Sequence, residues 1–187
     1  MGVDNFILNR NDSALLIIDM QERLFAAMTT DDREMIVKNN SILIETAGIF
    51  EMPIVVSEQY RKGLGETINP LAERLRGVET IEKLYFDCLR EELIRNKIES
   101  LEKNTVIITG IETHVCVLQT ALSLIKKGKN AVVVSDAVAS RRLRDREMAL
   151  VALLNAGVVV YPTETVAFML MEKAGTPEFK KLSPLFK

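Results

Sequence analysis

Short apolar runs alternate along the chain with segments whose apolar residues recur at helical spacing. Continuous apolar runs are typical of strands buried on both faces of a parallel sheet. The runs cover residues 14–18, 53–56, 105–108, 131–134 and 158–160, with a weaker strand at 79–83. The helical segments cover residues 31–50, 87–101, 115–127, 145–155 and 163–173, with a short helix at 71–75 and a loop at 58–69. This order predicts an α/β protein: a single three-layer, doubly wound domain over residues 1–187 with a six-stranded, mainly parallel sheet.

The composition is that of an ordinary globular protein and excludes several functional classes. The 187 residues are 48% hydrophobic and 27% charged, with a formal net charge of -2. No basic excess therefore indicates a nucleic-acid partner or an anionic membrane surface. Two cysteines in a chain of this length do not form a disulfide framework, and no signal peptide is recognised, so a cytoplasmic location is expected. The single histidine, His114, argues against metal sites built from several histidines, and no cofactor is expected.

Three polar residues follow the predicted strands at the points where strands end. Asp19 directly follows the first strand, Lys83 ends the third, and Cys116 lies a few residues past the fourth. Open parallel sheets place their sites beyond the carboxyl ends of the strands, at the switch in strand order. Strands one and four flank that switch in the usual doubly wound order, so we expect Asp19 and Cys116 to face each other there.

Each of these residues also has a simpler interpretation. Asp19 could cap a turn, Lys83 could be a solvated charge, and a cysteine in an apolar helix is often a small core residue. Cys88, which lies beside Leu89 in a predicted helix, is interpreted in this structural way. Cys116 differs because it falls in the first turn of a helix that follows a strand. There the helix dipole, free backbone N–H groups and a nearby lysine are expected to lower the pKa of the thiol.

Three motifs resemble those of the isochorismatase-like hydrolases, in the order in which that family has them. They are LLIIDMQ at residues 15–21, KLYF at 83–86 and GIETHVCV at 110–117. The resemblance is closest to the isochorismatase-domain-containing branch. It extends to EQY at residues 58–60 with GLG at 63–65, to DAV at 136–138 with SR at 140–141, and to FK at 179–180. The similarity runs over nearly the whole chain.

The resemblance implies a set of site residues. The catalytic triad of the family falls on Asp19, Lys83 and Cys116. The peptide bond between Ile111 and Glu112 would be the family's cis non-proline bond, and the backbone N–H groups of Glu112 and Cys116 would form the oxyanion hole. The substrate pocket is expected to include Gln21, Phe25, Tyr60, Phe86 and His114.

Two departures from the family pattern limit what the resemblance implies. Nicotinamidases of this superfamily hold a metal with Asp and His residues after the second strand, whereas residues 57–62 here read SEQYRK and contain no histidine. A metal is therefore not expected. The family commonly has serine after the phenylalanine of the lysine motif, and this chain has Asp87, which we interpret as a helix N-cap.

The expected activity is hydrolysis of an amide or a related bond in a small molecule. Asp19 would take the proton of Cys116, and the thiolate would form an acyl-enzyme while Lys83 keeps both groups charged. Isochorismatases themselves cleave a vinyl ether without the cysteine, so the fold alone does not define the bond. A base role for His114 is disfavoured because it lies only two residues from Cys116. A catalytically silent scaffold or binding module is the alternative of a different class.

Self-association is a further expectation. The last predicted helix is strongly apolar, and the tail from 176 to 187 carries four large apolar residues among its lysines. Such surfaces are typical of subunit contacts, so the chain is expected to form a homo-oligomer.

Overall fold

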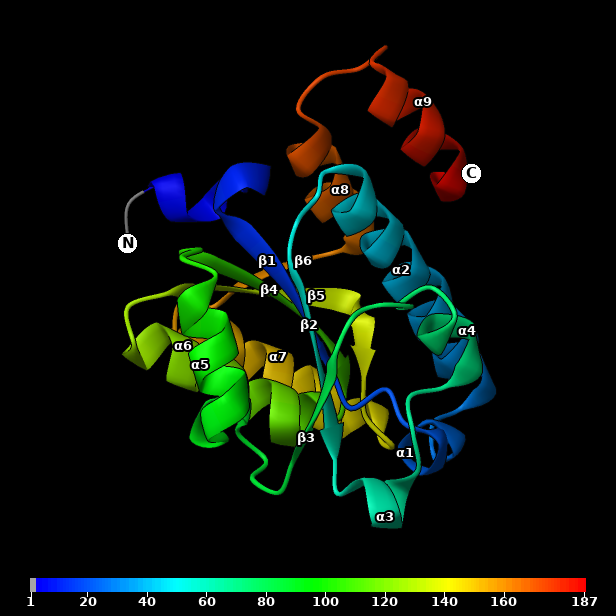
Figure 1. Ribbon diagram of the computed structural model, residues 1–187, viewed down its shortest axis with the longest axis vertical. Coiled ribbons are helices and arrows are strands. Elements are labelled where there is room, and N and C mark those ends of the chain that lie inside the picture. Colours follow the sequence, from blue (N-terminus) through cyan, green and yellow to red (C-terminus); the bar gives the residue numbers. More distant parts are fainter. Residues whose placement is uncertain (1–2) are drawn as a thin grey trace.

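The computed structural model describes residues 3–187, so only the first two residues of the predicted 1–187 domain lie outside it. A six-stranded sheet in the order β3-β2-β1-β4-β5-β6 forms its centre (Figure 1), and every pairing is parallel. The strands are β1 Ser13–Ile18, β2 Ile54–Gln59, β3 Thr80–Lys83, β4 Thr105–Ile111, β5 Asn130–Ala139 and β6 Val159–Tyr161. The predicted doubly wound α/β fold is confirmed.

Helices cover both faces of the sheet (Figure 1). Helices α2, α4 and α8 pack on one face, and α5, α6 and α7 pack on the other. The helices are α1 Glu22–Ala26, α2 Thr30–Ile49, α3 Arg61–Leu64, α4 Asn69–Ala72, α5 Glu92–Ser100, α6 Leu118–Lys126, α7 Leu143–Asn155, α8 Thr163–Met171 and α9 Pro177–Leu182. Shorter turns are η1 Val3–Phe6, η2 Arg10–Asp12, η3 Cys88–Arg90, η4 Thr113–Val117 and η5 Ser183–Phe186.

The continuous apolar run of β1 is explained by burial on both sides. Leu15 and Ile17 belong to the core cluster under α2, whereas Leu16 and Ile18 belong to the cluster under α6. Successive side chains of a strand point to opposite faces, so a strand with helices on both faces is apolar at every position.

Strands β1 and β4 are neighbours, and their carboxyl ends lie side by side. Ile18 is paired with Gly110 at the end of the ladder. Gly110 has φ +112°, and a Cβ there would lie 1.9 Å from the Ile18 carbonyl oxygen. Only glycine fits this approach. The two strands can therefore stay paired up to the residues that precede Asp19 and the η4 turn.

Several predicted element boundaries are wrong; β5, for example, continues to Ala139 instead of ending at residue 134. Residues 87–101 do not form one helix, because η3 ends at Arg90 and Glu91 is extended before α5 begins. Asp87 does cap this turn as predicted, accepting a hydrogen bond from the Leu89 N–H, but it also accepts one from Ser123 on α6. The predicted loop at 58–69 is shorter than expected, because β2 continues to Gln59 through its pairing with β3.

The apolar residues of the carboxyl-terminal tail were expected to pack on another surface, such as a second subunit, and the structure packs them on their own chain. Leu182 of α9 is fully buried with Ala167 and Met171 of α8. The ring of Phe168 contacts that of Phe179 edge to face, with centroids 6.2 Å apart. Figure 1 shows α9 beside α8 at the end of α2. The apolar face of α8 is therefore largely covered within the chain.

No helix within residues 3–187 combines the length and the apolar character needed to cross a bilayer.

Candidate active site

Asp19 is held in a strained backbone position at the end of β1. Its φ is +52°, in the left-handed region that is uncommon for residues other than glycine. The carboxylate is completely buried. Its Oδ1 accepts a hydrogen bond from Ser57 Oγ at 2.8 Å, and its Oδ2 lies 2.7 Å from Lys83 Nζ. Strained residues cluster at functional sites, so this geometry favours a site over a simple turn cap.

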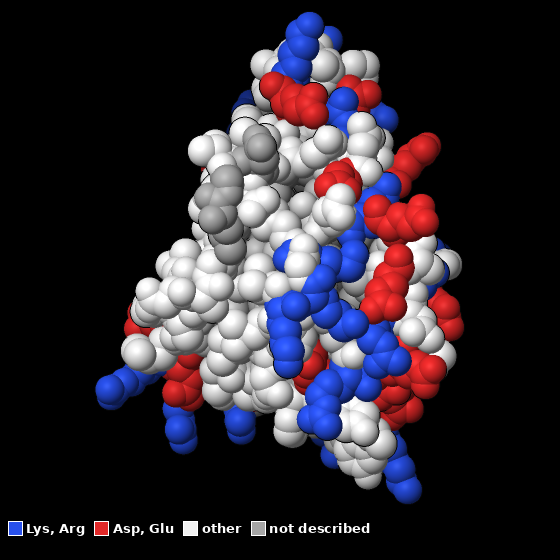
Figure 2. All heavy atoms as spheres, turned by 90° about the vertical axis from the view of Figure 1, so that its left-hand side faces the viewer, with Lys and Arg blue, Asp and Glu red and all other residues white. Residues whose placement is uncertain are grey.

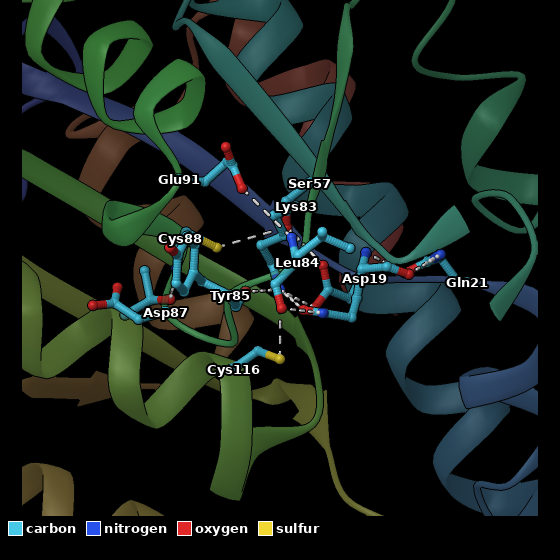
Figure 3. A network of polar contacts seen from close by, with 12 residues as sticks. Asp19, Gln21, Ser57, Lys83, Leu84, Tyr85, Asp87, Cys88, Glu91 and Cys116 are labelled. Atoms are coloured by element: carbon cyan, nitrogen blue, oxygen red, sulfur yellow. Dashed lines mark hydrogen bonds and ion pairs between the residues drawn. The ribbon is translucent and has the colours of Figure 1, made fainter. Parts of the chain in front are cut away.

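Lys83 ends β3 with its side chain fully buried, which excludes the solvated charge considered above. Its Nζ donates to Asp19 Oδ2 at 2.7 Å and to Gln59 Oε1 at 2.6 Å, and lies 3.6 Å from Cys116 Sγ (Figure 3). Burial by itself lowers the pKa of Lys83, but the negative charge of Asp19 and the nearby thiols of Cys88 and Cys116 outweigh it. The net result is a pKa above the usual value, so the group is an ammonium ion.

Cys116 lies in η4, the turn that connects β4 to α6, and its side chain is 5% exposed. Burial raises the pKa of the thiol well above its ordinary value, and the carboxylate of Asp19 raises it further. Lys83 acts in the opposite direction but does not compensate. The expectation that this environment lowers the pKa of the thiol is therefore wrong, because sequence reasoning included the attractive charge and omitted desolvation. The resting group is a thiol that needs a proton acceptor.

The turn before Cys116 begins at a cis peptide bond between Ile111 and Glu112. The Glu112 side chain is buried, and its Oε1 accepts hydrogen bonds from the backbone N–H and the Nε of Arg141, at 3.1 and 2.9 Å. The Glu112 carbonyl accepts hydrogen bonds from the N–H groups of Val115 and Val117. These contacts define the backbone of the turn that holds the two predicted oxyanion donors.

The predicted pocket residues are not all brought to the triad. Gln21 is fully buried, and its amide bonds to the backbone of Gln59 and Gly65, so it joins β1 to β2. Phe25 instead lines a hollow of about 560 Å³ together with residues of α2.

The other three pocket candidates lie around the site at different depths. Tyr60 and Phe86 follow the ends of β2 and β3 and are 49% and 55% exposed. His114 is half-buried in η4, and its Nδ1 lies 2.9 Å from Ser140 Oγ. The imidazole thus has a hydroxyl partner in Ser140.

Cys88 lies much closer to the site than the sequence suggested. It is in η3, completely buried, with its Sγ 3.7 Å from the Ser57 oxygen that donates to Asp19. Burial raises the pKa of the Cys88 thiol to about 11. Figure 3 shows it to the left of Lys83 and above Cys116.

Sequence reasoning missed two residues of this network, Ser57 and Gln59. Both belong to β2, at alternate positions, and were placed at the strand end or in the following loop. Residues 57–59 are all polar, so the sequence shows no alternation after the apolar run 53–56 that could have singled out these two positions. As for metals, residues 3–187 contain no group of three or more His, Cys, Asp and Glu side chains placed to hold an ion.

The fold and this buried cluster define a class of α/β proteins with Asp, Lys and Cys at the carboxyl ends of β1, β3 and β4. Residues 13–165 match the isochorismatase domain, and the chain belongs to that family. Membership supports a hydrolase function. The chain is 35% identical over 181 residues to the "secreted isochorismatase effector Isc1" of Phytophthora sojae, covering 95% of this chain and 85% of that protein. It is 36% identical over 182 residues to "isochorismatase family protein 1A" of Dictyostelium discoideum, covering 95% and 87%.

Two solved structures have closely similar folds. The "MAR1 ribonuclease" of Caenorhabditis elegans aligns with a TM-score of 0.88 and 33% identity, covering 96% of this chain and 91% of that chain. The YcaC gene product of Escherichia coli, described as an octameric hydrolase of unknown specificity, aligns with a TM-score of 0.87 and 26% identity, covering 96% and 89%.

Proposed function

We propose that the protein is a cysteine hydrolase that cleaves an amide, or a related C–N or ester bond, in a small molecule. One observation carries the proposal: the buried ammonium of Lys83 lies within 2.7 Å of Asp19 Oδ2 and 3.6 Å of Cys116 Sγ. A base, a nucleophile and a fixed positive charge in contact are the groups that nucleophilic acyl transfer needs.

The proton transfers follow from the charges of the resting site. The thiol of Cys116 gives its proton to the carboxylate of Asp19 as the sulfur attacks the carbonyl carbon. The ammonium of Lys83 stabilises the thiolate during this step, because it already contacts the sulfur. Asp19 then protonates the leaving amine or alcohol. In the second half Asp19 takes a proton from water, whose oxygen attacks the acyl carbon. Asp19 then returns this proton to the sulfur as the C–S bond breaks, which releases the acid and restores the free thiol.

The oxyanion of each tetrahedral intermediate needs hydrogen-bond donors in a fixed position. We propose that the backbone N–H groups of Glu112 and Cys116 supply them. The proposal is supported by the rigid start of η4, where the Arg141 backbone and side chain hold the Glu112 carboxylate. Removing one such donor typically costs ~10²–10³-fold in turnover.

The test is a substrate panel of small amides, esters and isochorismate-like vinyl ethers, assayed with the parent protein, Cys116→Ala and the matched control Cys88→Ala. We expect the parent and Cys88→Ala to hydrolyse an amide or ester, and Cys116→Ala to be inactive. Mass mapping after rapid quenching should find the acyl group on Cys116. A short single-stranded RNA is included because one structural neighbour is named a ribonuclease; the net charge of -2 provides no cationic excess for phosphates, and we expect no cleavage.

Three outcomes would contradict the proposal. If the protein cleaves a vinyl ether and Cys116→Ala keeps that activity, the reaction does not use the cysteine and the acyl-enzyme mechanism is wrong. If the protein cleaves the RNA, the proposal of a small-molecule substrate is wrong. Absence of turnover across the panel, in a folded parent whose Cys116 resists alkylation, would favour the catalytically silent scaffold.

We also propose that the protein forms a homo-oligomer through α7. Four large apolar side chains of this helix are exposed, at 58% for Leu143, 60% for Met148, 49% for Val151 and 55% for Leu154. A surface helix usually carries polar residues there. Figure 2 shows a broad area without charged side chains, next to a stripe of Lys and Arg, on the side where α6 lies, and α6 packs beside α7. The octameric YcaC structure supports assembly of this fold.

Light scattering after size-exclusion chromatography tests the assembly. Val151→Asp should lower the particle mass, whereas Leu93→Asp, a control at an apolar position of α5 that is 65% exposed, should not. An unchanged mass for Val151→Asp would refute this interface.

Two further properties remain predictions from the sequence. They are a single isochorismatase-like hydrolase domain over residues 1–187 and a cytoplasmic location.

A further inference from the structure

Strand β2 contributes no member of the triad, yet it contacts both charged members. Its side chains alternate between faces, so positions 57 and 59 point to the same side. Ser57 Oγ donates to Asp19 Oδ1 at 2.8 Å, and Gln59 Oε1 accepts from Lys83 Nζ at 2.6 Å. Glu58, between them, bonds to Thr67 instead. The strand therefore presents one neutral partner to each charge.

The Gln59 side chain is fixed in one orientation. It is 8% exposed, and its Nε2 donates to the Leu84 carbonyl at 2.8 Å. Its backbone N–H donates to Gln21 Oε1 at 2.7 Å, and its carbonyl accepts from Gln21 Nε2 at 3.0 Å. With the amide nitrogen used in this way, the amide oxygen is the end that faces Lys83.

The contact with Gln59 limits where the hydrogens of Lys83 can point. An ammonium ion has three N–H groups. Asp19 and Gln59 accept two of them at short distance, at 2.7 and 2.6 Å. The third is left for Cys116 Sγ at 3.6 Å or the Tyr85 carbonyl at 3.3 Å. Gln59 thus directs part of the positive charge toward the nucleophile.

The neutrality of Gln59 is equally important. The one carboxylate in the cluster, Asp19, already raises the pKa of Cys116. A second carboxylate on Lys83 would cancel more of its charge and disfavour the thiolate further. A neutral acceptor holds the ammonium without this cost.

We propose that Gln59 is a positioning residue, a neutral acceptor that holds the Lys83 ammonium against the sulfur of Cys116 and so makes the thiolate accessible. Its effect on turnover rests on the hydrolase function proposed above. Its effect on the thiol does not, because it can be measured without a substrate.

The experiment compares Gln59→Glu with Asn96→Asp, which makes the same change from amide to carboxylate at an exposed position of α5. The rate of alkylation of Cys116 by iodoacetamide is measured by peptide mapping between pH 7 and 10, alongside thermal unfolding. We expect Gln59→Glu to slow alkylation at least ~10-fold at each pH, since the thiolate fraction falls tenfold for each unit of pKa. Asn96→Asp should stay within about twofold, because an exposed charge on a different helix is screened.

Gln59→Met keeps the size of the side chain and removes the acceptor, which covers the case in which the glutamate variant fails to fold. We expect it to slow alkylation as well, by less than Gln59→Glu. A merely structural role predicts the opposite sign, because a loosened site exposes the thiol and speeds its alkylation. Unchanged or faster alkylation in both folded variants would overturn the proposal. Slower alkylation with no turnover across the substrate panel would uphold Gln59 and refute the hydrolase function.

Discussion

Replacement of Asp19 by asparagine separates the proposed catalytic base from a simple turn residue. Asp19 and Lys83 are both completely buried and their charged atoms lie 2.7 Å apart. The change to asparagine keeps the shape of the side chain and removes its charge. Removing one partner of a buried ion pair leaves an uncompensated charge and typically costs about 3–5 kcal/mol, whereas a lost cap costs about 0.5–2 kcal/mol. We therefore expect Asp19→Asn to fold with clearly reduced stability.

Urea denaturation of a double-mutant cycle measures this cost. The cycle consists of Asp19→Asn, Lys83→Met and the double variant. Each single change leaves one buried charge without its partner, and the double change leaves none, so the double variant should lose much less than the sum of the two. Asp12→Asn is the control, because Asp12 is only partly buried and its carboxylate bonds to the neutral Asn104 instead of to a charged group. Additive effects would show that the pair does not stabilise the fold as a unit.

The same variant tests the mechanism at a temperature at which it stays folded. Asparagine cannot take the thiol proton or return it to the leaving group, and loss of general acid–base catalysis typically costs ~10²–10⁴-fold in rate. The reduced negative charge beside Cys116 should instead favour its thiolate, because Asp19 raises the pKa of that thiol. The expected result is a variant that is alkylated at Cys116 at least as fast as the parent and does not turn over. Turnover within a few-fold of the parent would refute the role of Asp19.

Three further predictions concern the thiols and metal dependence. Limiting iodoacetamide should label Cys116, which is 5% exposed, before Cys88, which is 0% exposed, because alkylation requires access; preferential labelling of Cys88 in peptide maps would contradict this. Burial raises the pKa of Cys88 from 9.0 to about 11, so the folded protein favours the neutral thiol. Below pH 9 this preference contributes ~3 kcal/mol to the free energy of unfolding relative to strongly alkaline solution, and the contribution should be lost as the pH rises toward 11. Urea titrations of Cys88→Ala should show a smaller alkaline loss than the parent. EDTA should leave activity intact, since residues 57–62 contain no histidine; restoration of a lost activity by zinc or manganese would show the reverse.

The fold could be predicted because its main determinants are local. Six short strands separated by helical segments leave a parallel sheet with right-handed crossovers as the favoured arrangement. Strands one and four are then neighbours, which is why the sequence alone places Asp19 and Cys116 at one edge of the sheet. The motifs and their order indicated the family for the same reason, since they lie at strand ends.

Properties that depend on contacts between distant segments required the tertiary structure. The end of β2 at Gln59 is set by pairing with β3, so the partners of Lys83 and Asp19 on this strand could not be assigned from a single run of residues. The break at Glu91 follows a turn whose cap also bonds across to α6.

The charge state of Cys116 shows most clearly which property the sequence alone does not determine. Sequence spacing indicated that a lysine lies near Cys116, and this favours a thiolate. Burial is a property of the whole fold, and it raises the pKa of the thiol enough to reverse that expectation. The sequence alone determined which groups meet at the carboxyl ends of the strands. Only the tertiary structure decided how far water is excluded from them, and that exclusion makes a proton acceptor necessary.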